Sequence, residues 1–128
     1  MNMQPLRIEK SKSSPSVDFE PQTGMLAIDG ESYPEDSHQF FAPVVDWVET
    51  FLAEDPSIMT LRVNLTYMNT SSTKYMIDIL DRLETAHGEG RRVQVEWYYD
   101  EDNDREIDAI EELKEDFTMP FNLMAREW

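Results

Sequence analysis

Residues 59–86 read MTLRVNLTYMNTSSTKYMIDILDRLETA, and this stretch passes from the hydrophobic period of a strand to that of a helix. From Met59 to Tyr67 apolar and polar residues alternate, which predicts a strand with one buried face. From Ser71 onward the apolar residues recur three or four positions apart, which predicts an amphipathic helix. The expected inner stripe of this helix is Met76, Ile79, Leu80, Leu83 and Ala86. A strand that leads directly into a helix is the repeating unit of an α/β fold.

Strands and helices alternate on both sides of this stretch. The strands are expected at residues 6–9, 17–20, 25–29, 59–67, 92–99 and 121–125. The helices are expected from residue 36 or 37 to about 53, from 71 to a stop at Gly88 or Gly90, and from Asn103 or Asp104 to about 117. Pro43 falls inside the first helix and removes a hydrogen bond, so we expect the regular part of that helix to begin only near Ala42.

This order predicts an α/β sandwich in a single domain. Right-handed crossovers place the three helices mainly on one face of a mixed sheet of about five or six strands, with an antiparallel hairpin at its N-terminal side. Residues 1–14 are expected to form an N-terminal extension or edge strand, and residues 15–128 the domain itself. A chain of 128 residues is too short for two full domains, and a hydrophobic content of 40% argues against disorder.

The charge of the chain restricts its partners. Eleven Lys and Arg against 27 Asp and Glu give a net charge of −16, which repels nucleic acid and anionic membrane surfaces. The longest apolar runs fall far short of the roughly 20 residues of a membrane-spanning helix, so no membrane insertion is expected. With no cysteine and no apolar leader segment, the expected location is the cytoplasm.

The sequence offers little for catalysis. Two histidines and no cysteine are too few for a usual zinc site. Four scattered glycines cannot build a phosphate-binding loop, and no G-x-S-x-G elbow is present. Acidic residues are so frequent that no catalytic pair stands out. We therefore expect neither an enzyme nor a bound cofactor.

An acidic segment at residues 100–116 resembles a calcium loop at first sight. Asp100, Asp102, Asp104, Glu106, Asp108 and Glu111 occupy the ligand positions of an EF-hand. However, Arg105 stands where the turn requires glycine, and a strand precedes the segment where an entering helix should be. We therefore predict no metal site there. A solvated acidic face is the simpler interpretation, and a docking face for a basic partner is the alternative.

Four hydroxyl residues, Thr70 to Thr73, lie between the predicted strand and helix. One of them is expected to cap the helix. Residues 56–77 contain no Asp or Glu, although helix starts favour acids and composition alone predicts about four or five there. A helix start that lacks acids and carries Lys74 can accept a phosphate. The pattern therefore predicts phosphorylation within this run.

Four segments carry a family resemblance: DGESYPEDS at 29–37, DWVETFL at 46–52, LTYMNTSSTKYMIDILD at 65–81, and WYYDEDN at 97–103. They resemble the SiaC family of bacterial regulatory phosphoproteins over residues 15 to 125, and N-T-S-S-x-K is the most specific part. The hydroxyl run between strand and helix is also similar to that of STAS-domain anti-sigma factor antagonists.

The resemblance implies a STAS-like, non-enzymatic switch protein in a partner-switching system. A serine/threonine kinase would phosphorylate Thr70, the threonine of the motif, and a PP2C-like phosphatase would remove the phosphate. The unphosphorylated form would bind and activate a diguanylate cyclase, which raises cyclic di-GMP and favours biofilm growth or aggregation. Asn69, Ser71, Ser72 and Lys74 would belong to the recognition surface. The alternatives are an anti-sigma factor antagonist in a kinase and PP2C-phosphatase pathway, and an acidic calcium-binding module.

Overall fold

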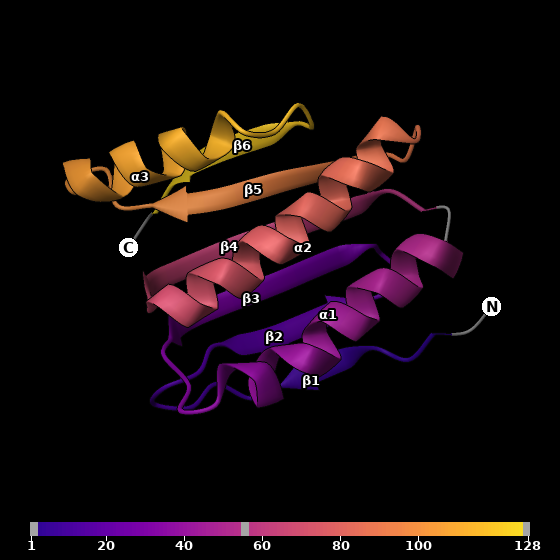
Figure 1. The fold of residues 1–128 in the computed structure, drawn as a ribbon, viewed down its shortest axis with the longest axis horizontal. Coiled ribbons are helices and arrows are strands. Elements are labelled where there is room, and N and C mark those ends of the chain that lie inside the picture. Colours follow the sequence, from indigo (N-terminus) through magenta and orange to yellow (C-terminus); the bar gives the residue numbers. More distant parts are fainter. Residues whose placement is uncertain (1–2, 55–56, 127–128) are drawn as a thin grey trace.

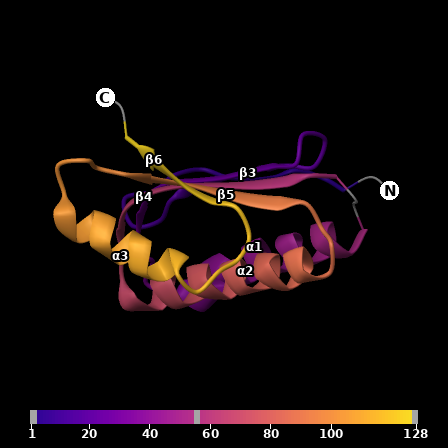
Figure 2. The ribbon, with the colours of Figure 1, turned by 90° about the horizontal axis from the view of Figure 1, so that it is seen from above.

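The structure, a computed structural model, describes residues 3–54 and 57–126. It is a six-stranded sheet with three helices on one face (Figures 1 and 2). The strands are β1 (Leu6–Ile8), β2 (Ser16–Glu20), β3 (Met25–Ser32), β4 (Met59–Met68), β5 (Val93–Tyr99) and β6 (Phe121–Ala125). The helices are α1 (Ser37–Glu54), α2 (Thr70–Gly88) and α3 (Asp104–Lys114). The predicted α/β class and the predicted order of elements are confirmed.

The strands lie in the sheet in the same order as in the chain. The first three strands are antiparallel, whereas β3, β4, β5 and β6 are parallel to one another. Each parallel step crosses over through one helix, and crossovers of one hand that all move the same way place every helix on the same face. Figure 2 shows this single helical layer. The carboxyl ends of the parallel strands consequently meet at one edge of the sheet, where α1 and α2 both begin.

The core lies between the sheet and the helical layer. Two buried rows cross the sheet, formed by Leu26, Leu61, Val95 and Phe121 and by Ile28, Val63 and Trp97. The inner stripe predicted for α2 is buried in full. α1 covers the β1–β3 side through its own buried face, in which Trp47 stacks on Phe51 with ring centroids 5.1 Å apart. The alternating and helical periods of the sequence thus identified the side of each element that faces the core.

Polar contacts fix the far half of α2. Arg82 on this helix pairs with Glu49 of α1 and with Asp78 of its own helix. Glu84 accepts hydrogen bonds from the hydroxyl and the amide of Thr118, at 2.6 and 2.9 Å. The bond from the Thr118 hydroxyl is the main reason that the pKa of the Glu84 carboxyl lies below its ordinary value. This contact therefore stabilises the fold at neutral pH and weakens as the pH falls through the lowered pKa.

Two boundary predictions were wrong at the edge where α1 begins. β3 continues to Ser32 instead of ending at Asp29, because Gly30 takes a φ of 131° and the pairing with β4 shifts there without stopping. α1 begins at Ser37, so Pro43 lies within the helix and does not delay its start. Pro43 removes a hydrogen bond to the carbonyl of Gln39, and both residues are exposed, so water can reach that carbonyl.

Two further expectations differ from the structure. Tyr67 was expected on the buried face of its strand, but it is 53% exposed, because the pairing with β3 shifts between Leu65 and Tyr67 and breaks the alternation near the end of β4. α3 ends at Lys114, earlier than predicted. Phe117 therefore follows the helix and lies half-buried against Phe121, with ring centroids 6.3 Å apart.

Candidate functional site

Helix α2 begins at the edge of the sheet where the parallel strands end, and a side chain caps its N-terminus. Asn69 is the N-cap, and its Oδ1 accepts a hydrogen bond of 2.9 Å from the amide of Ser72. Its own amide donates to the carbonyl of Ser32 at 2.9 Å, which ties the cap to β3. The prediction that a hydroxyl residue caps this helix was wrong, because asparagine, one of the strongest capping residues, stands one position earlier. Thr70 is therefore the first residue of the helix.

The second and third hydroxyls of the run are held by partners on the chain before α2. The Ser72 side chain is completely buried, and its hydroxyl lies 2.7 Å from that of Ser32. The Ser71 hydroxyl lies 2.5 Å from that of Ser37, at the start of α1, and 3.2 Å from Oδ1 of Asn69. These bonds hold the beginnings of the two helices together.

Thr70 differs from the other three hydroxyl residues. Thr73 is half-buried, and its hydroxyl donates to the carbonyl of Asn69 at 3.0 Å. Thr70 is the exposed member of the run, and within residues 3–54 and 57–126 its hydroxyl makes no hydrogen bond. A hydroxyl that is both exposed and unbonded can be reached by an enzyme without breaking any contact of the fold.

The remaining residues of the motif divide between surface and interior. Lys74 is exposed, one turn after Thr70 on α2. Asn69 and Ser71 are half-buried at the rim of the site. Ser72 faces the core, so the expectation that it belongs to a recognition surface was wrong. Its position four residues before buried Met76 explains this, because residues four apart share one face of a helix.

The neighbours of the motif come from the β3–α1 connection. Tyr33 packs edge-on against Tyr67, with ring centroids 5.9 Å apart, and Ser37 reaches Ser71. No local feature of the sequence indicated that Tyr33 and Ser37 belong to the site. However, neighbouring parallel strands end at the same edge of the sheet, and this rule could have identified the β3–α1 connection as part of the site. This connection also contributes one acidic side chain, that of Asp36, which precedes Ser37. Its Oδ1 accepts a hydrogen bond from the amide of Gln39 at the start of α1.

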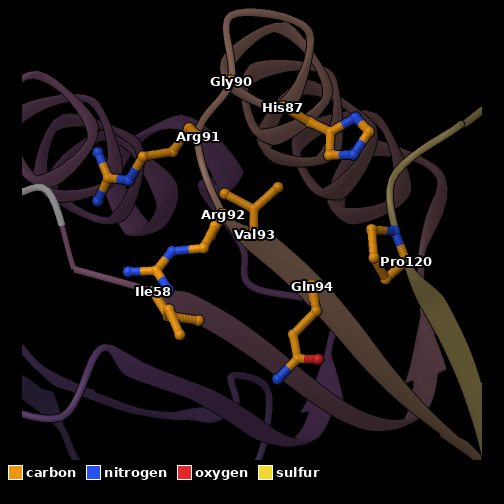
Figure 3. Close-up of a pocket in the computed structure, with 8 residues that line it drawn as sticks. All are labelled: Ile58, His87, Gly90, Arg91, Arg92, Val93, Gln94 and Pro120. Atoms are coloured by element: carbon orange, nitrogen blue, oxygen red, sulfur yellow. The ribbon is translucent and has the colours of Figure 1, made fainter.

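A pocket of about 460 Å³ lies at the opposite edge of the sheet, beside the beginnings of β4 and β5 (Figure 3). Its lining residues are Ile58, His87, Gly90, Arg91, Arg92, Val93, Gln94 and Pro120. The guanidinium of Arg91 points away from His87 and donates to the carbonyls of Leu52 and Ser57, so it ties the end of α1 to the start of β4. None of the predicted site residues lines this pocket.

The acidic segment is a helix start with its own structural contacts. Asn103 caps α3 through Oδ1, which accepts the amide of Glu106 at 3.1 Å. Four of the six acids with EF-hand spacing lie on this helix instead of in a loop, namely Asp104, Glu106, Asp108 and Glu111. Glu106 is already engaged by Arg126 at 3.3 Å. Over residues 3–54 and 57–126, no three side chains of the metal-binding types come together as a set of ligands.

We therefore expect calcium to leave the protein unchanged. A calcium titration followed by calorimetry should give no dissociation constant below about 10 μM, the range of calcium sensors. A tighter constant that is lost in a Glu111→Gln variant would contradict this prediction.

Comparison with known proteins identifies the chain's relatives. A family model described as "SiaC family regulatory phosphoprotein" matches residues 8–126. SiaC of Pseudomonas aeruginosa is 44% identical with a TM-score of 0.91, over 97% of this chain and 100% of that one. A chain in the crystal structure of the diguanylate cyclase SiaD in complex with its activator SiaC, from the same organism, is 45% identical with a TM-score of 0.92, over 94% of this chain and 99% of that one.

A curated relative points the same way. An uncharacterized protein of Pseudomonas aeruginosa strain UCBPP-PA14 is 44% identical over 125 residues, which cover 98% of this chain and 99% of the relative. Within the part of the chain that the structure describes, no helix is both long and apolar enough to cross a bilayer. The motif residues Asn69 to Lys74 lie inside the matched range. The chain belongs to the SiaC family of regulatory phosphoproteins.

Proposed function

We propose that this protein is a non-enzymatic regulator that binds and activates a diguanylate cyclase, and that phosphorylation of Thr70 switches this binding off. The solved complex of a 45% identical activator with its cyclase supports the choice of partner. Cyclic di-GMP levels, and through them biofilm growth or aggregation, would then follow the phosphorylation state. A serine/threonine kinase and a PP2C-like phosphatase in the cytoplasm would set that state.

One observation carries the choice of Thr70. Among four consecutive hydroxyl residues, three are half-buried or buried and hydrogen-bonded, and Thr70 is exposed with no hydrogen bond within the described residues. A kinase must bring its catalytic groups to the acceptor oxygen, and a phosphatase must later reach the phosphate. Thr70 meets both conditions while the fold stays intact.

The position of Thr70 also suits a phosphate. The first amides of a helix have no intrahelical acceptor, and Asn69 occupies the amide of Ser72, so those of Thr70 and Ser71 remain to face an anion. Lys74 stands four residues further along the same face. The carboxylate of Asp36, at the start of α1, carries the same sign of charge as the phosphate and therefore reduces this stabilisation. The phosphate adds about −1.5 to −2 charges to the surface, which is enough to repel a partner without a change of fold.

Phosphorylation should therefore be confined to Thr70. After incubation with the cognate kinase, the intact mass is expected to rise by one phosphate, and peptide fragmentation should place it on Thr70. A Thr70→Ala variant should remain unmodified, whereas a Ser71→Ala variant should be modified like the wild type. A phosphate on Ser71, Ser32 or Thr118 would contradict the proposal.

A further inference from the structure

We propose that the pocket beside the beginnings of β4 and β5 binds a small organic anion, a molecule with an apolar body and a carboxylate or phosphate group. The volume of the pocket, about 460 Å³, lies within the usual range for ligand sites. The pocket lies at the edge of the sheet opposite to the one where α2 begins, so this inference is independent of the proposed switch at Thr70.

The charge of the lining distinguishes this pocket from the rest of the surface. The chain has 27 acidic residues and a net charge of −16, but none of the acids in the described part of the chain lines the pocket. Three basic residues line it: His87, Arg91 and Arg92. Cations around a hollow with low-dielectric walls concentrate the field and attract anions. The pocket therefore favours an anion that most of the surface repels.

Two of these basic side chains are not used by the fold. Arg91 is used, because its guanidinium donates to the carbonyls of Leu52 and Ser57. Arg92 is exposed, and its guanidinium forms neither a hydrogen bond nor an ion pair within residues 3–54 and 57–126. The half-buried ring of His87 likewise forms no hydrogen bond with a described residue. Figure 3 shows Arg92 and His87 on opposite sides of Val93, so an anion that lies over Val93 has a donor on either side.

The apolar walls of the pocket suit the body of the ligand. Val93 is only 3% exposed and closes the floor, whereas Ile58 is 45% exposed and its apolar surface can still be covered. Ile58 lies on the side of Arg92 and Pro120 on the side of His87 (Figure 3). Each donor thus has apolar surface beside it. Covering that surface favours a ligand that joins an apolar body to its anionic group.

The walls are held in place before a ligand arrives. The amide of Gln94 donates to the hydroxyl of Thr60 at 2.9 Å, and the backbone amide of Met59 donates to the carbonyl of Arg92 at 3.0 Å. The amides of residues 89–91 donate to the last carbonyls of α2, which reduces the negative charge that this helix end presents to an anion. A preformed site loses little free energy to ordering when a ligand binds.

Two acids lie near the pocket without lining it. The Glu84 carboxylate accepts hydrogen bonds from the hydroxyl and amide of Thr118 and from the amide of Met119. Glu89 lines a neighbouring hollow beside Leu52. The charges of both acids oppose an anionic ligand, so we expect a modest affinity that depends strongly on Arg92.

The test is a titration of the ¹⁵N-labelled protein, followed by NMR, with phenyl phosphate, phenylacetate, inorganic phosphate and 2-phenylethanol. At least one of the two aromatic anions should bind with a dissociation constant of about 1 mM or tighter. It should shift the amides of His87, Val93 and Gln94 and leave that of Thr70 unchanged. Inorganic phosphate lacks the apolar body and 2-phenylethanol lacks the charge, so each should bind at least about fivefold more weakly. The tighter of the two aromatic anions identifies the preferred acidic group.

Variants assign the binding to the lining residues. Arg92→Gln should weaken binding of the aromatic anion by about tenfold, because it removes the charge-assisted donor. Ile58→Ser should weaken it by about threefold or more, because it removes apolar surface. Arg105→Gln is the matched control, since Arg105 is equally exposed but lies on α3 and does not line the pocket. Circular dichroism melts check that each variant is folded.

Three results would overturn the inference. The first is that neither aromatic anion shifts these amides, or that Arg92→Gln binds like the wild type. The second is that inorganic phosphate binds as tightly as phenyl phosphate, which would mean an adventitious ion only. The third is that 2-phenylethanol binds as tightly as the aromatic anions, which would mean an apolar hollow that does not select for charge.

Discussion

Replacing Thr70 with aspartate is expected to weaken binding of the cyclase by roughly tens to hundreds of fold, because it introduces a negative charge that has no counterpart on the partner's side of the contact. The fold should be unaffected. A carboxylate at the first position of a helix is favoured by the helix dipole, and Lys74 lies one turn away, so the melting temperature should stay within a few degrees of the wild type.

Thr70→Ala provides the opposite expectation. Alanine removes the γ-methyl group together with a hydroxyl that makes no hydrogen bond within the described residues, and it adds no charge, so its affinity should stay close to that of the wild type. Thr85→Asp is the matched control, since Thr85 is exposed on the same helix but about four turns away from Thr70. Equal affinities of the Thr70→Asp and Thr70→Ala proteins would mean that Thr70 has no part in the switch. A collapsed melting temperature for Thr70→Asp would assign the effect to folding.

Replacing Arg126 with methionine is expected to lower the free energy of unfolding by about 3 kcal/mol, because it breaks a nearly buried ion pair. The Arg126 side chain is 5% exposed and donates to Glu106, to Oδ1 of Asn64 at 2.6 Å and to the carbonyl of Tyr98. Removing the cation leaves the Glu106 carboxylate without this partner at the start of α3. The polar groups on β4 and β5 lose donors at the same time.

Arg7 offers a matched control for this prediction. It pairs with Asp18 and Glu20, but its side chain is 59% exposed, so Arg7→Met should cost no more than about 1 kcal/mol. Urea unfolding of both variants gives the comparison. A double variant with Glu106→Gln should recover part of the loss, since no unpaired charge remains. If Arg126→Met costs as little as Arg7→Met, burial does not strengthen this ion pair.

The elements of the fold could be predicted because their signals are local. Alternation in β4 and the inner stripe of α2 assigned a buried side to each element, and the rule for crossovers placed the helices on one face. The end of β3 could not be predicted in the same way. Gly30 normally marks a turn, and only pairing with the neighbouring β4 keeps the strand going to Ser32.

The candidate site was predicted in part for a similar reason. The hydroxyl run and the missing acids identified the start of α2, but neither signal separates one hydroxyl from the next. The period of the helix separates them, since Ser72 lies on the buried side with Met76, whereas Thr70 lies on the exposed side with Lys74. The bond from Ser71 to Ser37 spans 34 residues, and no local pattern announces a contact of that kind.

The most direct test compares two forms of the wild-type protein that differ by one phosphate on Thr70. Peptide mass fixes the position of the phosphate, and calorimetry measures the affinity of each form for the cyclase. We predict that the phosphorylated form binds at least about tenfold more weakly and that phosphatase treatment restores the affinity. Equal affinity of the two forms, with the phosphate verified on Thr70, would contradict the account.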